Sequence, residues 1–90
     1  MDFKWDETKR LKVLAERGVD FIDLVVLLDG RPSITNESNA YAETRNVTIA
    51  ELNGKLFAMI WTMRGEKIRI ITARRARRGE ERAYRQLFYG

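Results

Sequence analysis

The chain has 90 residues, of which 17 are basic and 13 acidic, and its formal net charge is +4. It contains neither cysteine nor histidine, which excludes a disulfide framework, a thiol nucleophile, a thiolate zinc site and an imidazole base. An apolar fraction of 44% argues against disorder, and a chain of this length has room for one core, so residues 1–90 are expected to form one domain. No metal ion or other cofactor is expected.

No apolar run approaches the roughly 18 residues that are needed to cross a bilayer. The opening stretch MDFKWDETKR also lacks the apolar segment of a signal peptide. The chain is therefore expected to be a cytoplasmic protein without membrane contact.

The first part of the chain predicts a short strand and a helix. Residues 3–5 alternate apolar and polar side chains, as short strands do. Asp6 is placed to cap a helix, and Gly18 is placed to end that helix in the left-handed conformation. Apolar residues recur between them at helical spacing, at Leu11, Leu14 and Ala15.

Residues 20–42 give a mixed pattern. Asp20 can cap a second helix, whereas Val25 and Val26 favour a strand. The spacing of the apolar residues fits a helix better than strict alternation, so a helix is predicted here. Residues 30–42 hold the only proline and several serine, threonine and asparagine residues, and they are expected to form a loop.

The rest of the chain predicts a meander and a closing helix. Strands are expected at 43–52, 55–63 and 67–73, with tight turns at Asn53-Gly54 and at 64–66, and a helix at 78–88. The fold class is therefore α+β, with two N-terminal helices, an antiparallel meander sheet with a short N-terminal strand, and a C-terminal helix. One sheet face would pack on helices, and the other would form a shallow surface.

Positive charge is concentrated toward the C-terminus. Residues 64–90 carry 9 basic and 3 acidic groups, whereas residues 1–63 carry 8 basic and 10 acidic groups. This asymmetry indicates a polyanion or an acidic protein as partner, with a solvated basic face as the alternative. Arginine suits phosphate, because its planar guanidinium makes two hydrogen bonds at once and stays charged.

The arginines are expected on rigid elements. In the final strand, Arg69 and Ala73 should point away from Ile68 and Ile70, because side chains alternate along a strand. Arg74 and Arg75 follow where this strand ends, and the next helix carries Arg78, Arg82 and Arg85 on one face.

Short motifs occur in a fixed order along nearly the whole chain. They are Phe3-x-Trp5-Asp6-x-x-Lys9, Gly18-Val19-x-Phe21, Glu43-x-Arg45, Gly54, Trp61-Thr62-x-Arg64-Gly65 and, most specific, IRIITARRA at 68–76 followed by Glu80 and Tyr84. Together they resemble the BrnT family of type II toxins. The chain departs from the family pattern at Glu16-Arg17-Gly18, where relatives usually have Lys-His-Gly, at Val13 in place of an asparagine, and at Glu81 in place of an arginine.

The resemblance implies a RelE-like fold and an endoribonuclease. Such an enzyme would cleave RNA, and messenger RNA in particular, by metal-independent attack of a ribose 2′-hydroxyl on the neighbouring phosphate. Phosphate binding and charge stabilisation are then assigned to Arg64, Arg74 and Arg75. Candidates for proton transfer or for orienting these arginines are Lys9, Glu80 and Tyr84. Further RNA contacts are expected from Arg69, Arg17, Arg45 and Arg78.

The resemblance also implies a BrnA-like antitoxin that covers the basic surface, forms a hetero-oligomer with the toxin and represses the shared promoter. Operator DNA would be contacted only through the antitoxin. Two alternatives stay open. A catalytically inactive module of the same fold would only bind RNA or a partner, and the absence of histidine supports this alternative. A structural protein with an incidental basic tail would lose little besides solubility on replacement of Arg74 and Arg75.

Overall fold

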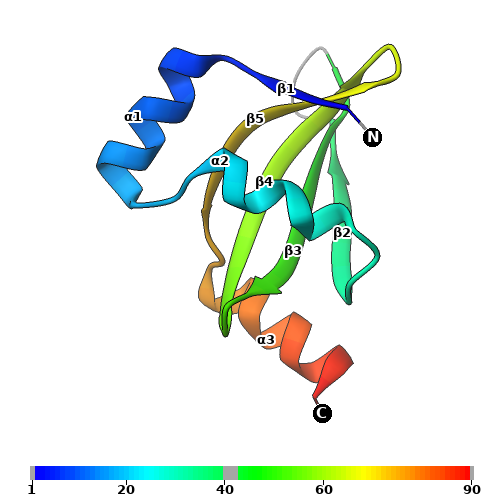
Figure 1. The fold of residues 1–90 in the computed structure, drawn as a ribbon. Helices are drawn as coiled ribbons and strands as arrows, with labels where there is room; N and C mark the ends of the chain where they lie inside the picture. The colour runs from blue at the N-terminus through cyan, green and yellow to red at the C-terminus, as the bar shows by residue number, and fades with distance from the viewer. Residues whose placement is uncertain (1, 40–42, 90) are drawn as a thin grey trace.

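The computed structural model of the chain describes residues 2–39 and 43–89. Within these residues, five strands form one mixed sheet in the order β1-β5-β4-β3-β2 (Figure 1). The strands are β1 (Phe3–Trp5), β2 (Ser33–Ser38), β3 (Arg45–Leu52), β4 (Lys55–Arg64) and β5 (Lys67–Arg75). Strands β2 to β5 pair antiparallel, whereas β1 joins the edge of β5 in parallel. The predicted α+β class, the meander and the short first strand are confirmed.

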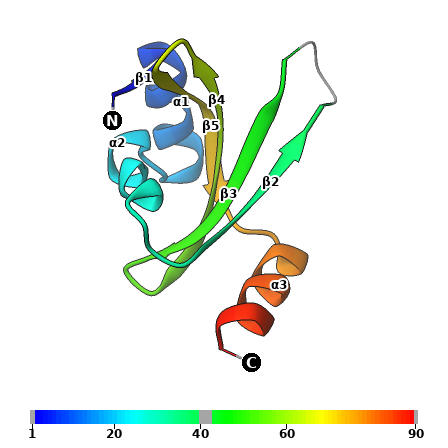
Figure 2. The same ribbon diagram turned by 90° about the vertical axis from the view of Figure 1, so that its right-hand side faces the viewer.

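Helices lie on both sides of this sheet (Figure 2). One side carries α1 (Glu7–Arg17), α2 (Phe21–Leu24) and the 3₁₀ helix η1 (Val25–Leu28), and the other carries α3 (Arg78–Phe88). The covered face is the sheet face that packs on α1, α2 and η1, through Phe57, Met59, Trp61, Ile70 and Ala73. The open face carries Val47, Ile49, Leu56, Ala58 and Ile60, and α3 covers only one end of it, where Tyr84 packs.

The helix α1 begins and ends at the residues that the sequence predicts. The Asp6 carboxylate accepts the Lys9 backbone N–H at 3.2 Å, which satisfies a donor that the first helical turn leaves unpaired. Gly18 follows the helix with a φ of 67°, in the left-handed conformation that glycine adopts without strain.

The packed face of α1 is not its apolar stripe. Leu11 and Leu14 remain 52% and 37% exposed, and Val13 is the buried side chain of this helix. Val13 lies between two arginines of the same face, Arg10 and Arg17, which bond to Asp20 and to β5, respectively. Hydrogen bonds and an ion pair therefore hold α1 in place beside the apolar contact of Val13.

Residues 21–28 are helical, as predicted, but the helix changes type at Val25. Buried side chains recur every three residues, at Phe21, Leu24 and Leu27. This spacing matches the three residues per turn of a 3₁₀ helix. The branched side chains of Val25 and Val26 also lower α-helix propensity at this point.

The prediction of a loop at 30–42 is wrong for residues 33–38, which form β2 and pair with β3. β2 is an edge strand, so only one of its sides needs a partner and its polar side chains can face water. Ile34 packs into the core beneath α3, and the hydroxyls of Thr35 and Thr48 lie 2.8 Å apart. Residues 40–42 of the expected loop lie outside the described residues.

The predicted turn at Asn53-Gly54 is confirmed. Asn53 and Gly54 have φ values of 54° and 78°, and two positive values in succession are what a type I′ turn requires. The final strand runs to Arg75, two residues past its predicted end at Ala73. The C-terminal helix spans the predicted residues. None of the helices in the described ranges is long and apolar enough to cross a membrane.

The strand β5 contains a bulge in its pairing with β4. Ile60 pairs with Thr72, but its neighbour Trp61 pairs with Ile70. Ile71 is therefore an extra residue that has no counterpart on β4 at this step.

The bulge reverses the alternation of side chains along β5. Ala73 packs with Ile70 in the covered-face core, whereas strict alternation predicted it beside Arg69. Beyond the bulge, Arg74 shares the open face with Arg69, and Arg75 lies on the covered face. The prediction for Ala73 is wrong because a bulge shifts every later residue to the opposite face.

Candidate functional site

Three arginines of the open face meet a lysine of α1 beside β5. Lys9 comes from α1, Arg45 from β3, Arg64 from β4 and Arg69 from β5. With the carboxylates of Asp6 and Glu43 they line a hollow of about 240 Å³, which we call the cationic hollow. A site of this size and charge can take up one phosphate group and part of its sugar.

The sheet register explains why the hollow forms here. Thr62 of β4 pairs with Arg69 of β5. On the other side of β4, Thr62 lies opposite Arg45 of β3, because the neighbouring pair across these two strands is Asn46 and Trp61. The row Arg45, Thr62, Arg69 thus runs across three strands, with a small residue between two long ones. The Thr62 hydroxyl is turned down to the Thr44 carbonyl, to which it donates at 2.7 Å. The two arginines therefore flank a floor that no long side chain fills.

Glu43 connects two of the arginines. Arg64 donates to one of its carboxylate oxygens at 3.2 Å, and the Arg45 Nε lies 3.8 Å from the other. All three side chains are partly exposed, at 35% for Glu43, 29% for Arg45 and 49% for Arg64. A ligand from solution can therefore reach them. The sequence singled out Glu43 only as part of a motif, although its two-residue spacing from Arg45 predicts that both lie on one face of a strand.

Arg74 and Glu80 form a separate site at the α3 end of the open face. The guanidinium donates to both carboxylate oxygens, at 2.7 and 3.0 Å. Glu80 also accepts the Arg77 backbone N–H at 2.8 Å, which caps α3. The Arg74 guanidinium holds the pKa of Glu80 below its ordinary value. The β4 partners of Arg69 and Arg74 are four residues apart, or ~13 Å.

Arg75 lies on the covered face and does not reach the cationic hollow. Its guanidinium stacks over the Phe57 ring at 5.4 Å, and its Nε donates to the Leu56 carbonyl at 3.3 Å. Adjacent residues in a strand point to opposite faces, so Arg74 and Arg75 cannot act on one phosphate from the same side.

Tyr84 belongs to the core rather than to the open surface. It is 2% exposed, and its hydroxyl donates to the Pro32 carbonyl at 3.0 Å. Burial raises the pKa of this phenol above its ordinary value. The hydroxyl predicted as a candidate proton donor thus attaches α3 to the start of β2.

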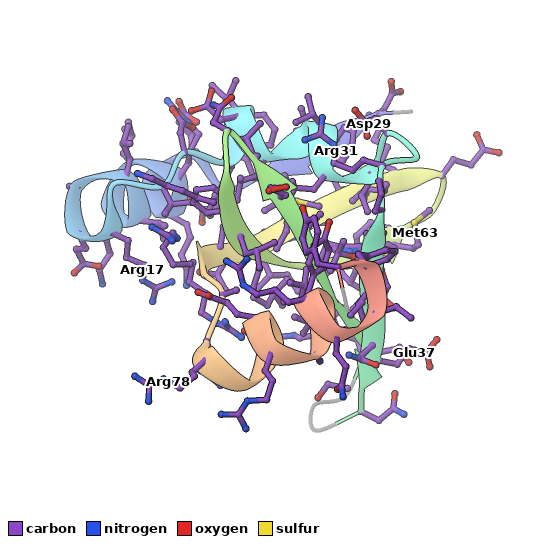
Figure 3. The ribbon with its side chains drawn as sticks, turned by 90° about the horizontal axis from the view of Figure 1, so that it is seen from below. Arg17, Asp29, Arg31, Glu37, Met63 and Arg78 are labelled. Atoms are coloured by element: carbon purple, nitrogen blue, oxygen red, sulfur yellow. The ribbon has the colours of Figure 1, made fainter. Side chains whose placement is uncertain are left out.

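The two remaining candidates also lie outside the cationic hollow. Arg17 donates to the Thr72 hydroxyl at 3.2 Å and to the Ala73 carbonyl at 2.9 Å, so it bonds to β5 at its bulge. Arg78 begins α3 and projects into solvent (Figure 3). Of the ten predicted site residues, the structure brings together Lys9, Arg45, Arg64 and Arg69.

Among residues 2–39 and 43–89, no group of three or more acidic side chains is arranged to hold a metal ion. The charge in the cationic hollow comes from side chains that are positive at neutral pH, and such groups bind anions.

The fold and the cationic hollow together define a small α+β domain with a cluster of basic side chains beside the open face of its sheet. The sequence profile of one family, described as the ribonuclease toxin BrnT of type II toxin–antitoxin systems, matches residues 5–80. The chain therefore belongs to the BrnT family. The matched range contains the whole cationic hollow and ends before Tyr84. A comparison with curated proteins gives no significant match.

Proposed function

We propose that this ribonuclease toxin is an endoribonuclease that cleaves messenger RNA at the cationic hollow, without a metal ion. The observation that carries this proposal is the convergence of three arginines of the open face with a lysine of α1. A phosphate in this position would face guanidinium groups from three different strands. Groups held on strands keep their positions, so they can stabilise charge without reorganising during the reaction.

The reaction is attack of a ribose 2′-oxygen on the adjacent phosphorus. Negative charge builds on the phosphate oxygens as the new bond forms, and Arg64 and Arg69 would stabilise it from two sides. The departing 5′-oxygen needs a proton, and the Lys9 ammonium lines the same hollow. Arg45 would hold the neighbouring part of the RNA backbone.

An antitoxin partner follows from the family. We propose that it is BrnA-like and that an acidic or amphipathic segment of it covers the cationic hollow, because opposite charge and exclusion of RNA suffice for neutralisation. The resulting hetero-oligomer would repress its own promoter through the antitoxin's contacts to operator DNA. Toxin and messenger RNA would meet in the cytoplasm.

A non-catalytic module that binds RNA or a partner is the second candidate. Two observations favour it: the chain has no histidine, and Arg17, which stands where relatives usually have histidine, is bonded to β5. Arginine does not release a proton at neutral pH and cannot replace a histidine in proton transfer. Turnover separates the two functions. An enzyme cleaves many RNA molecules, whereas a binder protects RNA in proportion to the amount of protein that is present.

The test is growth and transcript integrity after induced expression without antitoxin. Wild type is compared with the double variant Arg64→Ala/Arg69→Ala and with the control Arg82→Ala/Arg85→Ala, which removes the same charge from the exposed side of α3. We expect growth arrest and new RNA ends in wild type and control. The hollow variant should cleave at least ~100-fold more slowly, because it lacks two groups that stabilise charge.

Two results would contradict the proposal. Equal cleavage by the hollow variant would place the active site elsewhere. Normal growth and intact transcripts with soluble wild-type protein would exclude the ribonuclease activity and favour the binding module.

A further inference from the structure

We infer that Glu43 is the general base of this ribonuclease, the group that takes the proton from the attacking 2′-hydroxyl. This inference rests on the proposed function and assigns the one step that the four cations cannot perform. Basic side chains that are protonated at neutral pH can bind phosphate or donate a proton, but they cannot accept one.

Two acidic side chains line the described part of the cationic hollow, and one of them is already engaged. The Asp6 carboxylate caps α1 through the Lys9 backbone N–H. Among the described residues, the Glu43 carboxylate contacts two side chains, Arg64 at 3.2 Å and Arg45 at 3.8 Å. Its carboxylate is 35% exposed and can be approached from the open face.

The position of Glu43 matches the geometry that this step requires. In RNA, the 2′-hydroxyl and the phosphate that it attacks belong to the same linkage. A base must therefore lie beside the group that binds the phosphate, within ~3 Å of the hydroxyl oxygen. Glu43 is bonded to Arg64, which we assign to the phosphate. The Arg45 Nε lies 3.8 Å from the other carboxylate oxygen, so Glu43 lies beside two of the cations that would bind the RNA backbone.

The 2′-hydroxyl transfers its proton to the Glu43 carboxylate, and the 2′-oxygen forms a bond to phosphorus. The bond between phosphorus and the 5′-oxygen breaks, its electron pair stays on that oxygen, and the Lys9 ammonium supplies the proton. The products are a 2′,3′-cyclic phosphate and a 5′-hydroxyl, and exchange with water restores both side chains.

A competing explanation is that Glu43 merely occupies the phosphate position until RNA displaces it. Glu43→Gln distinguishes the two, because it keeps the size and removes both the negative charge and the basic oxygen. If Glu43 is only a competitor for phosphate, its replacement should strengthen RNA binding and leave cleavage unchanged or faster. If Glu43 is the base, binding is kept or strengthened while cleavage is lost.

The experiment uses the purified chain and a reporter messenger RNA, presented free and in a cell-free translation mixture. Cleavage rates are compared for wild type, Glu43→Gln, Glu43→Asp and the control Glu16→Gln, which removes one exposed carboxylate at the end of α1. Binding is measured separately with a 2′-O-methyl RNA oligonucleotide, which lacks the attacking hydroxyl. We expect Glu43→Gln to cleave at least ~100-fold more slowly and to bind at least as tightly. Glu43→Asp should keep part of the activity, and Glu16→Gln all of it.

The possible failures are distinguishable. Cleavage by Glu43→Gln at the wild-type rate, with tighter binding, would overturn the assignment of the base and leave the proposed function intact. A second result would also overturn the assignment of the base and leave the proposed function intact. In that result, Glu43→Gln is folded but no longer binds RNA, and Glu43→Asp is equally inactive. No cleavage of either form of RNA by wild type would overturn the proposed function, and the general base with it.

Discussion

Arg74 and Arg75 follow each other in the sequence and have separate roles in the structure. Arg74 makes a two-point ion pair with Glu80 on the open face, and Arg75 stacks on Phe57 on the covered face. Both guanidinium groups hold parts of the fold together. The arginines that face an open hollow are instead Arg64 and Arg69, which end one strand and occupy the middle of the next.

The ion pair between Arg74 and Glu80 leads to a prediction about stability and pH. Because Arg74 lowers the pKa of Glu80 in the folded protein, the pair stabilises the fold at pH values above the ordinary value of 4.5. This stabilisation is lost as the pH falls through the lowered pKa. We expect Glu80→Gln to reduce the free energy of unfolding by roughly 1–2 kcal/mol at pH 7, and by clearly less at pH 3.

Urea unfolding at both pH values measures this effect. Glu81→Gln is the matched control, since the Glu81 carboxylate forms a long ion pair of 3.8 Å with the exposed Arg85. An equal loss in the two variants, or a loss that does not change with pH, would show that the Arg74 pair contributes no special stability.

At the scale of elements, local signals predicted what depends on local chemistry. The cap at Asp6, the left-handed Gly18 and the Asn53-Gly54 turn each depend on the conformation of a few neighbouring residues. The strand β2 could not be found in this way. Its polar side chains lack the alternation of a half-buried strand, and it is stabilised by pairing with β3, which begins seven residues after it ends.

The attachment of α3 depends on one side chain. Tyr84 is the buried residue of this helix, and its hydroxyl bonds to the Pro32 carbonyl. We expect Tyr84→Phe to lower the free energy of unfolding by about 1 kcal/mol, because the carbonyl loses its donor in a partly buried position. Tyr89→Phe makes the same chemical change at an exposed hydroxyl, which bonds to Glu51 at 2.7 Å, and should cost less. Denaturant unfolding of both variants tests this order, and a larger loss in Tyr89→Phe would contradict it.

At the scale of the whole molecule, the cationic hollow is a product of strand order. Lys9, Arg45, Arg64 and Arg69 come from the first helix and three different strands. The sequence predicted all four as site candidates but grouped Arg64 with Arg74 and Arg75. Charge density along the chain pointed to the C-terminal third, where arginines are most frequent. The site instead combines residues from both halves.

Binding of RNA at this hollow should depend on salt in proportion to the phosphates that it neutralises. Four phosphate contacts to single-stranded RNA predict a slope of roughly −3 when the logarithm of the binding constant is plotted against the logarithm of the salt concentration. Arg69→Ala should weaken binding and make the slope shallower by ~0.7, whereas Arg82→Ala should leave it unchanged. Titration of a 2′-O-methyl RNA oligonucleotide at several salt concentrations gives these slopes. Equal changes in both variants would indicate diffuse attraction to the whole protein rather than binding at the hollow.

The sequence by itself determined the α+β class, most helix and strand boundaries, the absence of thiol and imidazole chemistry, and the family. These follow from composition and from residues close together in the chain, whose effects act over one or two turns. Only the tertiary structure decided which arginines share a site. The bulge at Ile71 and the β5-β4-β3 strand order set the face and the neighbours of each side chain, and pairing between distant segments fixes both.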